Sequence, residues 1–426
     1  MLEKTAALYR KILHIRLTDT FAGLPPHALE PVSPNNPLKR LLKVLLYTGG
    51  RLVLNLFKVN KPIGHLQGKV WLYVVSQNNY DSLRFLAEAL PDTAFVAGQN
   101  KNIGKYGKQV NRLSFRFKLL YYYKFPFVLW SLYKSHGRRA LRFFDLVYDA
   151  IGFYEIYLRL LKQYRPAAIV FANDHNADAR AMLYAAKAHS IPTIYIQHAS
   201  VSTSFPPLEH DLSLLEGQDA LDKYKQCGPI RGEVQFIGMP KADVYIQHRK
   251  AATPVRYLGI CCNTIDSTQG IRAVVQLLTQ KFPELQLTVR PHPRDTRDFS
   301  FLQALNPHIV LSDAKKENAF DFLLHQDLII AGDSSIHLEA VMLNIPGIYY
   351  KFDKDVALND YYGYAQQGLV EQANAAPELA ALIQSYRQHR PDVYLRAQYY
   401  NATVGTANDG RSSELAITYI REYLKF

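Results

Sequence analysis

The chain has 426 residues, of which 48% are hydrophobic, and a formal net charge of +13. This hydrophobic content excludes a disordered protein, and the length favours two or three domains. Three cysteines, two of them adjacent, exclude a disulfide scaffold and have no zinc-ligand spacing, so we expect a protein of the reducing cytoplasm.

The first residues lack the pattern of a secretory signal, and no run of about 18 uncharged apolar residues occurs in the chain. We therefore expect a soluble or peripheral protein. Residues 38–57 interleave leucines with lysines and arginines. This pattern suits attachment to the surface of an anionic membrane.

Short apolar runs separated by helical patterns predict a parallel α/β domain in the first half of the chain. We place this Rossmann-like domain at residues 1–240. Its strands are expected at residues 70–75, 94–97, 168–172, 193–197, 212–215 and 234–237.

Residues 101–162 are predicted to form a helical insertion in that domain. They carry thirteen lysines and arginines against three acidic residues, interleaved with aromatic side chains. Such a surface binds either lipid headgroups or nucleic acid. Because no nucleic-acid module is recognisable, we expect no nucleic-acid partner and favour an anionic membrane surface. A helical insert whose aromatic residues form a core remains an open alternative.

Three titratable residues follow predicted strands of the first domain directly: Asp174, His198 and Glu216. Because parallel strands end at one edge of a sheet, these side chains are expected at the rim of a ligand-binding cleft. Each is a candidate general base. Asp174 is our first choice because its carboxylate is already ionised at pH 7, although it equally suits the N-cap of the next helix.

A second Rossmann-like domain is predicted at residues 255–408, after a polar stretch. Its strands are expected at residues 256–262, 285–289, 308–311, 328–331 and 347–351. The last segment, residues 409–426, contains a helical pattern and is predicted to cross back to the first domain. The fold class is therefore α/β, with two Rossmann-like domains around a central cleft.

Two strand ends in the second domain carry groups that suit a phosphate. Arg290-Pro291-His292-Pro293 places Arg290 and His292 on a rigid extended segment. Ser334 and Ser335 follow another short strand at a predicted helix start, where hydroxyls and backbone N–H groups attract anions. Asn263 and Thr264 follow a third strand and are expected to line the same pocket.

These two motifs resemble the His-Pro and paired-serine motifs of GT-B glycosyltransferases that build bacterial capsule and lipopolysaccharide from CMP-activated acidic sugars such as Kdo and sialic or other nonulosonic acids. The CDP-glycerol glycerophosphotransferases of teichoic-acid synthesis show a similar pair. The resemblance implies that His292, Ser334 and Ser335 bind the donor phosphates and that Glu339 reaches the ribose or base. It also supports His198 as a base, and relates Glu216-Gly217 to an acidic-Gly motif of which one acidic position is Leu215.

The resulting hypothesis is an inverting, metal-independent glycosyltransferase without a cofactor. It would move an acidic sugar from a CMP-linked donor to a saccharide or lipid-linked glycan acceptor at the inner face of the cytoplasmic membrane. Three alternatives stay open: a CDP-glycerol-type glycerophosphotransferase, an enzyme similar to UDP-sugar epimerases, and a non-catalytic scaffold of polysaccharide assembly.

Overall fold

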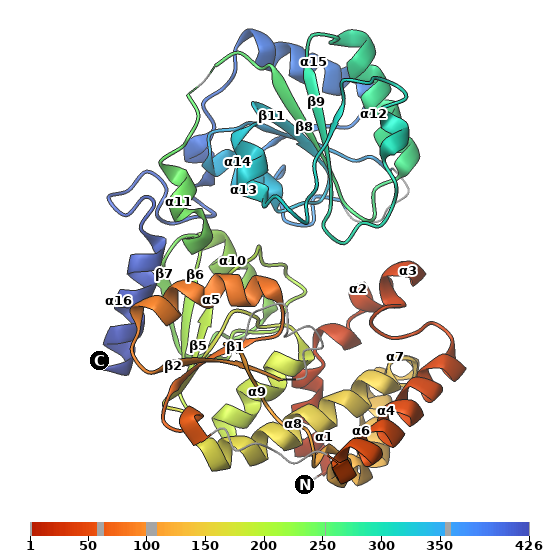
Figure 1. The fold of residues 1–426 in the computed structure, drawn as a ribbon, viewed down its shortest axis with the longest axis vertical. Helices are drawn as coiled ribbons and strands as arrows, with labels where there is room; N and C mark the ends of the chain where they lie inside the picture. Colours follow the sequence, from red (N-terminus) through yellow and green to blue (C-terminus); the bar gives the residue numbers. More distant parts are fainter. Residues whose placement is uncertain (1, 58–63, 99–108, 252, 354–358, 426) are drawn as a thin grey trace.

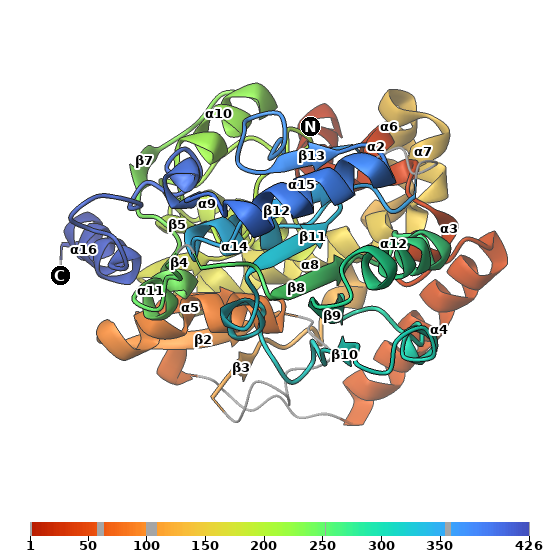
Figure 2. The ribbon, with the colours of Figure 1, turned by 90° about the horizontal axis from the view of Figure 1, so that it is seen from above.

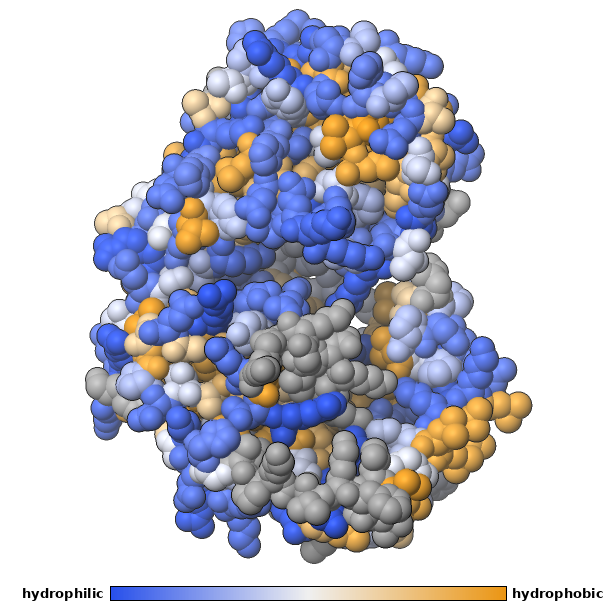
Figure 3. Space-filling model, viewed as in Figure 1, coloured by the Kyte–Doolittle hydropathy of each residue, from blue (hydrophilic) through white to orange (hydrophobic). Residues whose placement is uncertain are grey.

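The computed structural model describes residues 2–57, 64–98, 109–251, 253–353 and 359–425. Two parallel sheets form two α/β domains, one above the other along the long axis of the molecule (Figure 1). The surface is hollowed between these domains (Figure 3). Helices α4 (Pro37–Phe57) and α16 (Ser412–Leu424) lie at opposite sides of the molecule in both ribbon views (Figure 2).

The first sheet has seven parallel strands in the order β3-β2-β1-β4-β5-β6-β7. The sequence predicted six of them, because each is a short apolar run between helical patterns. The seventh, β3, has two residues and no apolar run. The strands are β1 (Val70–Val74), β2 (Thr93–Ala97), β3 (Asn111–Arg112), β4 (Ala168–Phe171), β5 (Thr193–Ile196), β6 (Leu212–Leu215) and β7 (Glu233–Phe236).

The second sheet has six parallel strands in the order β10-β9-β8-β11-β12-β13. The edge strand β13 was not predicted, because its polar sequence has no strand pattern. The strands are β8 (Tyr257–Cys262), β9 (Gln286–Pro291), β10 (Val310–Leu311), β11 (Leu328–Ala331), β12 (Gly347–Tyr350) and β13 (Glu371–Ala373). Helices α12 (Thr268–Lys281), α13 (Ala319–Leu324), α14 (Ile336–Met342) and α15 (Ala376–Gln388) cover this sheet.

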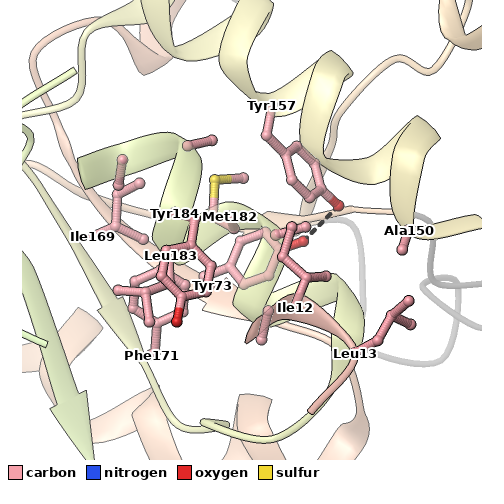
Figure 4. Close-up of a cluster of buried hydrophobic side chains, with 14 of the residues drawn as sticks. Ile12, Leu13, Tyr73, Ala150, Tyr157, Ile169, Phe171, Met182, Leu183 and Tyr184 are labelled. Carbon is pink, nitrogen blue, oxygen red and sulfur yellow. Dashed lines mark hydrogen bonds between the residues drawn. The ribbon is translucent and has the colours of Figure 1, made fainter. Parts of the chain in front are cut away.

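Each face of the first sheet has its own core. On one face, α1 (Leu2–Ile12), α8 (Phe144–Tyr164) and α9 (Ala177–Ala188) pack against the inward side chains of β1 and β4. In Figure 4, Tyr73 of β1 lies among α1, α8 and α9 side chains, and its hydroxyl bonds to that of Tyr157 at 2.7 Å. The other face is covered by α5 (Gln77–Ala89) and α16.

The C-terminal helix α16 belongs spatially to the first domain. Ala416 and Ile420 pack with Val70 and Leu72 of β1, and Arg421 donates to the carbonyl of Ala89 at 2.8 Å. The chain passes between the domains at η5 (Pro240–Ala242) and α11 (Asp243–Ile246), where Asp243 accepts the backbone N–H groups that begin α16.

The described part of the basic and aromatic insertion is mostly helical from Lys118 onward, and residues 109–117 are irregular apart from β3. It comprises η4 (Lys118–Lys124), α6 (Phe125–His136), α7 (Arg138–Arg142) and α8. Residues 101–108 of this predicted insertion and Lys58 lie outside the described residues. Val128 and Leu132 of α6 are buried in the core, whereas Phe127 and Trp130 on the same helix are about 60% exposed. The segment therefore adds side chains to the core and also exposes aromatic side chains.

None of the described helices combines the length and hydropathy that crossing a bilayer requires.

Candidate active site

The strand order of the second sheet reverses between β8 and β11, which are paired neighbours: β9 and β10 are added on one side, and β12 and β13 on the other. Ligands of open parallel sheets bind outside the carboxyl ends of strands at such a point. The residues that follow these two strands are Asn263 and Thr264 on one side and Asp333, Ser334 and Ser335 on the other. The side-chain amide of Asn263 donates to the Asp333 carbonyl at 3.0 Å, so the two loops form one surface.

Both serines are partly exposed and precede α14. The sequence predicted a helix that starts at Ser334, but α14 is shorter and starts at Ile336. The Ser334 hydroxyl accepts the Ile336 N–H at 3.4 Å, a long and weak contact. The Ser335 side chain makes no cap hydrogen bond to α14. Both hydroxyls are therefore available to donate to an anion.

His292 follows β9, the strand beside β8, and its side chain is exposed. Its Nδ1 accepts the backbone N–H of Arg294 at 3.1 Å. Partial desolvation of the ring and the charge of the nearby Arg294 lower the pKa of His292, so the ring is neutral at pH 7. Because Nδ1 accepts, the proton of the neutral ring is on Nε2. The residue therefore presents an N–H donor, as phosphate binding requires.

Asp333 is used within the protein rather than for a ligand. Its carboxylate accepts the Tyr349 hydroxyl at 3.0 Å and the Tyr361 N–H at 2.5 Å. These bonds hold the segment from Tyr361 to Tyr364, which reaches the first domain. There Lys223 donates to the Tyr362 carbonyl at 2.7 Å, and the hydroxyls of Ser200 and Tyr364 are hydrogen-bonded.

Two predicted donor-binding residues have other partners. The guanidinium of Arg290 was expected to contact phosphate, but it is buried. It donates to the Ser312 hydroxyl at 2.7 Å and to the Glu317 carbonyl at 2.8 Å. Glu339 was expected to reach the ribose or base, but its carboxylate pairs with Lys241 at 2.5 Å. Arg290 is therefore corrected to a structural residue, and Glu339 to a contact between the second domain and η5.

Asp174 is also corrected. It is only 3% exposed, and it accepts the Tyr224 hydroxyl at 2.5 Å and His175 Nδ1 at 3.0 Å. Burial favours its neutral form, but the hydrogen bonds from His175 and Tyr224 and the charge of Arg180 lower its pKa. An inaccessible, weakly basic carboxylate is a poor general base. The N-cap of α9, which we considered as the alternative role of Asp174, is Asn176, whose side chain accepts the Asp178 N–H.

Asp174 instead orients His175, the next residue in the chain. The His175 side chain is 35% exposed and packs beside Phe205. When His175 is neutral and donates from Nδ1 to Asp174, its Nε2 carries a lone pair. The adjacent Asp-His pair after a strand was the available sequence signal for this arrangement.

His198 follows β5 in the same part of the first domain. Burial and the charges of Lys241 and His175 lower its pKa to about 4, whereas a hydrogen bond to the Ala172 carbonyl opposes that shift. Its Nδ1 is buried and without a partner among the described residues. Nε2 lies 3.4 Å from the side-chain nitrogen of Asn79 as well as near the Ala172 carbonyl, so the tautomer decides whether Nε2 accepts or donates. In the tautomer with the proton on Nε2, the neutral ring has a lone pair on Nδ1.

Glu216 follows β6 and is 1% exposed. Burial raises its pKa to about 7, against the opposing charge of Lys241. Gln197 donates to Oε2 at 3.3 Å, while Oε1 has no partner in the described residues. A carboxyl group that titrates near pH 7 is suited to proton transfer.

Lys241 connects these residues to the second domain, and sequence reasoning missed it. Its charge acts on both His198 and Glu216, and its ammonium pairs with Glu339. The side chain is 40% exposed although groups from both domains surround its charged end. This combination is expected of a cation that lines an interdomain cleft. No local sequence pattern marks it, because its partners are distant in the chain.

Two facing Rossmann-like domains with polar strand ends directed at one another define a fold of the GT-B type. Comparisons with known proteins support this class. The model of the family described as CDP-glycerol:poly(glycerophosphate) glycerophosphotransferase matches residues 267–422. A search of curated proteins found no match.

Solved structures of similar fold belong to two groups. The wall teichoic acid polymerase TagF is 11% identical and covers 92% of this chain and 98% of its own, with a TM-score of 0.52. A histidine-to-asparagine variant of TagF with CDPG is 12% identical, covers 91% of this chain and 96% of its own, and has a TM-score of 0.51. The UDP-GlcNAc 2-epimerase from Neisseria meningitidis, bound to UDP-GlcNAc, is 11% identical. It covers 83% of this chain and 100% of its own, with a TM-score of 0.55.

At these identities the structural likeness establishes the fold alone. The family match covers the second domain from residue 267 onward and most of α16, and it supports a transferase. It favours the CDP-glycerol alternative over the CMP-linked acidic sugar that we first expected.

Proposed function

We propose that this protein is a glycerophosphotransferase that uses a CDP-glycerol-type donor. The observation that carries this proposal is the family match over residues 267–422, since this segment contains His292, Ser334 and Ser335. These residues lie at the carboxyl ends of β9 and β11, the two strands that flank β8, where a parallel sheet binds its ligand. The CMP-linked acidic sugar, the capsule and lipopolysaccharide setting and the Kdo or nonulosonic specificity have no such support.

The donor is bound by neutral hydrogen-bond donors in this proposal. His292 Nε2–H and the hydroxyls of Ser334 and Ser335 contact the diphosphate, and Asn263 and Thr264 line the same pocket. Arg290 stabilises the β9 loop from within the domain. Groups that are already oriented toward the phosphate stabilise charge that develops as the leaving group departs. The reaction is proposed to need neither a metal ion nor a cofactor.

The acceptor approaches from the first domain, and His198 is the proposed base. Its Nδ1 has no hydrogen-bond partner among the described residues, and the charge of Lys241 acts on the ring at the boundary with the second domain. His175, oriented by Asp174, and Glu216 are the alternatives. A glycan or lipid-linked glycan with a free hydroxyl is the proposed acceptor.

In the proposed reaction, the acceptor oxygen forms a bond to the β-phosphorus of the donor. The bond from that phosphorus to the bridging oxygen breaks, and CMP leaves with the bridging oxygen. His198 takes the hydroxyl proton and later releases it to solvent. The products are the acceptor extended by glycerol phosphate, and CMP.

An epimerase is the second candidate, and the similarity to the UDP-GlcNAc 2-epimerase favours it only through the fold. A donor panel in a thermal-shift assay separates the two, since a ligand that binds only the folded state raises its melting temperature. We expect stabilisation by CDP-glycerol and CDP but not by UDP-GlcNAc or a CMP-linked acidic sugar. Stabilisation by UDP-GlcNAc alone would contradict the proposal, and the absence of any nucleotide effect would favour a scaffold.

Attachment to the inner face of the cytoplasmic membrane is part of the proposal. Its support is the excess of basic residues in the insertion and in α4, together with exposed aromatic side chains such as Trp130. Such surfaces bind anionic headgroups.

A further inference from the structure

Helix α4 packs on the protein with its polar side. Arg40 is buried and donates to the carbonyls of Pro34 and Asn35. Three more residues on this side of α4 also make polar contacts. Lys43 pairs with Asp145 of α8 at 3.0 Å, Tyr47 accepts from Lys118 of η4 at 3.1 Å, and Thr48 bonds to the Tyr148 hydroxyl at 2.8 Å.

The opposite side of α4 is apolar and exposed. Its residues recur at helical spacing, and between 47% and 73% of each is exposed: Leu38, Leu41, Leu42, Leu45, Leu46, Leu52 and Val53. We call these seven residues the α4 stripe. Figure 3 shows it as a hydrophobic band at the edge of the first domain. A surface helix of a globular protein normally buries its apolar side and exposes its polar side. Here the arrangement is reversed.

Exposed aromatic and apolar residues continue the stripe onto neighbouring elements. Helix η4 contacts both α4 and α6. It exposes Leu120 and Tyr123, and α6 exposes Phe127, Trp130 and Tyr133. Tyrosine and tryptophan are typical of surfaces that are apolar in one part and wet in another.

The charge around this surface is of one sign. Residues 37–57 and 109–144 contain no aspartate or glutamate, whereas they contain twelve lysines and arginines. A second copy of the chain placed on the stripe would bring these positive charges against their own counterparts, which disfavours a dimer. An anionic bilayer complements them and also accepts the leucines.

We propose that α4 lies in the plane of an anionic lipid bilayer, with the α4 stripe inserted below the headgroups and Trp130 at headgroup depth. The inference deepens the membrane attachment proposed above and rests on it. It specifies insertion of one helix, whereas the composition alone suggested adsorption by charge. It does not depend on which donor the second domain binds.

Vesicle flotation of the full chain tests the proposal. The probe is a vesicle of phosphatidylcholine with phosphatidylglycerol, compared with one of phosphatidylcholine alone. We expect binding to the anionic vesicle that persists in ~1 M NaCl, where charges are screened within about 3 Å. The double variant Leu42→Gln, Leu46→Gln is expected to lose about tenfold or more of this binding. The control is Val244→Gln, Leu395→Gln, because these residues are similarly exposed, at 65% and 60%, but lie outside the stripe; it should bind as the unmodified chain does.

Fluorescence gives a second readout, since the chain has two tryptophans and Trp71 is fully buried. A blue shift on adding vesicles therefore reports Trp130 and should be absent in Trp130→Phe.

Equal flotation of both double variants, or release of the protein by high salt, would overturn insertion. A stripe variant that changes the oligomeric state in solution without changing flotation would assign the stripe to self-association instead. CMP release with a soluble acceptor should be the same for both double variants. A failed flotation experiment would therefore contradict membrane insertion but not the transfer reaction, and a failed transfer assay would contradict the transfer reaction but not membrane insertion.

Discussion

The substitution His292→Ala removes one N–H donor from the proposed phosphate site and little else. In the described part of the chain, the ring makes one hydrogen bond, in which Nδ1 accepts the Arg294 N–H, and the side chain is exposed. The stability of the fold should therefore hardly change. Loss of one oriented donor to developing charge costs about 3–4 kcal/mol, which corresponds to a fall in turnover of roughly 10²–10³-fold.

The assay is CMP release from CDP-glycerol in the presence of acceptor, with the melting temperature measured in parallel. His308→Ala is the matched control. His308 is also exposed and in the second domain, but its carbonyl accepts from Gln286 at the amino end of β9, the opposite edge of the sheet. The control should retain full turnover. Wild-type turnover by His292→Ala, or an equal loss in both variants, would refute the phosphate assignment.

Three further substitutions test the roles assigned to Asp174, Arg290 and Glu216. Asp174→Asn should destabilise the protein by about 2–4 kcal/mol, because the buried carboxylate accepts from Tyr224 and His175. Urea unfolding measures this loss of stability. Wild-type stability with lost turnover would restore Asp174 as the base. Arg290→Lys should lower the melting temperature, since lysine lacks the forked guanidinium that contacts Ser312 and Glu317, and it should leave turnover per folded molecule unchanged. An unchanged melting temperature with lowered turnover would restore the contact of Arg290 with phosphate. Burial raises the pKa of Glu216 from its ordinary value of 4.5 to about 7, so its contribution to stability is full below pH 4.5 and is lost as the pH rises through 7. This loss of unfolding free energy is on the order of 3 kcal/mol, and Glu216→Gln should remove it when unfolding curves at pH 5 and pH 8 are compared. A pH dependence of stability that the substitution leaves unchanged would contradict the raised pKa.

The strands were predictable because buried parallel strands are continuous apolar runs. All eleven predicted strands are present within a few residues of their expected bounds. The two that were missed, β3 and β13, are short and polar, and pairing with a neighbouring strand defines them rather than their own sequence. The start of α14 was misplaced because a serine pair suits the turn before a helix as well as its first residues.

The positions of the candidate site residues followed from the rule that parallel strands end at one edge. Their partners did not, because these come from distant parts of the chain. Arg290 contacts Glu317, Asp174 contacts Tyr224, and Glu339 contacts Lys241 from the other side of the domain boundary. Periodicity also could not show that α4 turns its apolar side outward, since an amphipathic pattern is the same whichever side is buried.

The proposed reaction is tested most directly with CDP-glycerol labelled in its glycerol phosphate. We expect the label to move to a glycan acceptor with release of one CMP for each transfer. We also expect His198→Ala to abolish this transfer without lowering the binding of CDP. Incorporation of the sugar of a CMP-linked acidic donor but not of labelled glycerol phosphate, or epimerisation of UDP-GlcNAc without acceptor, would contradict the proposed reaction.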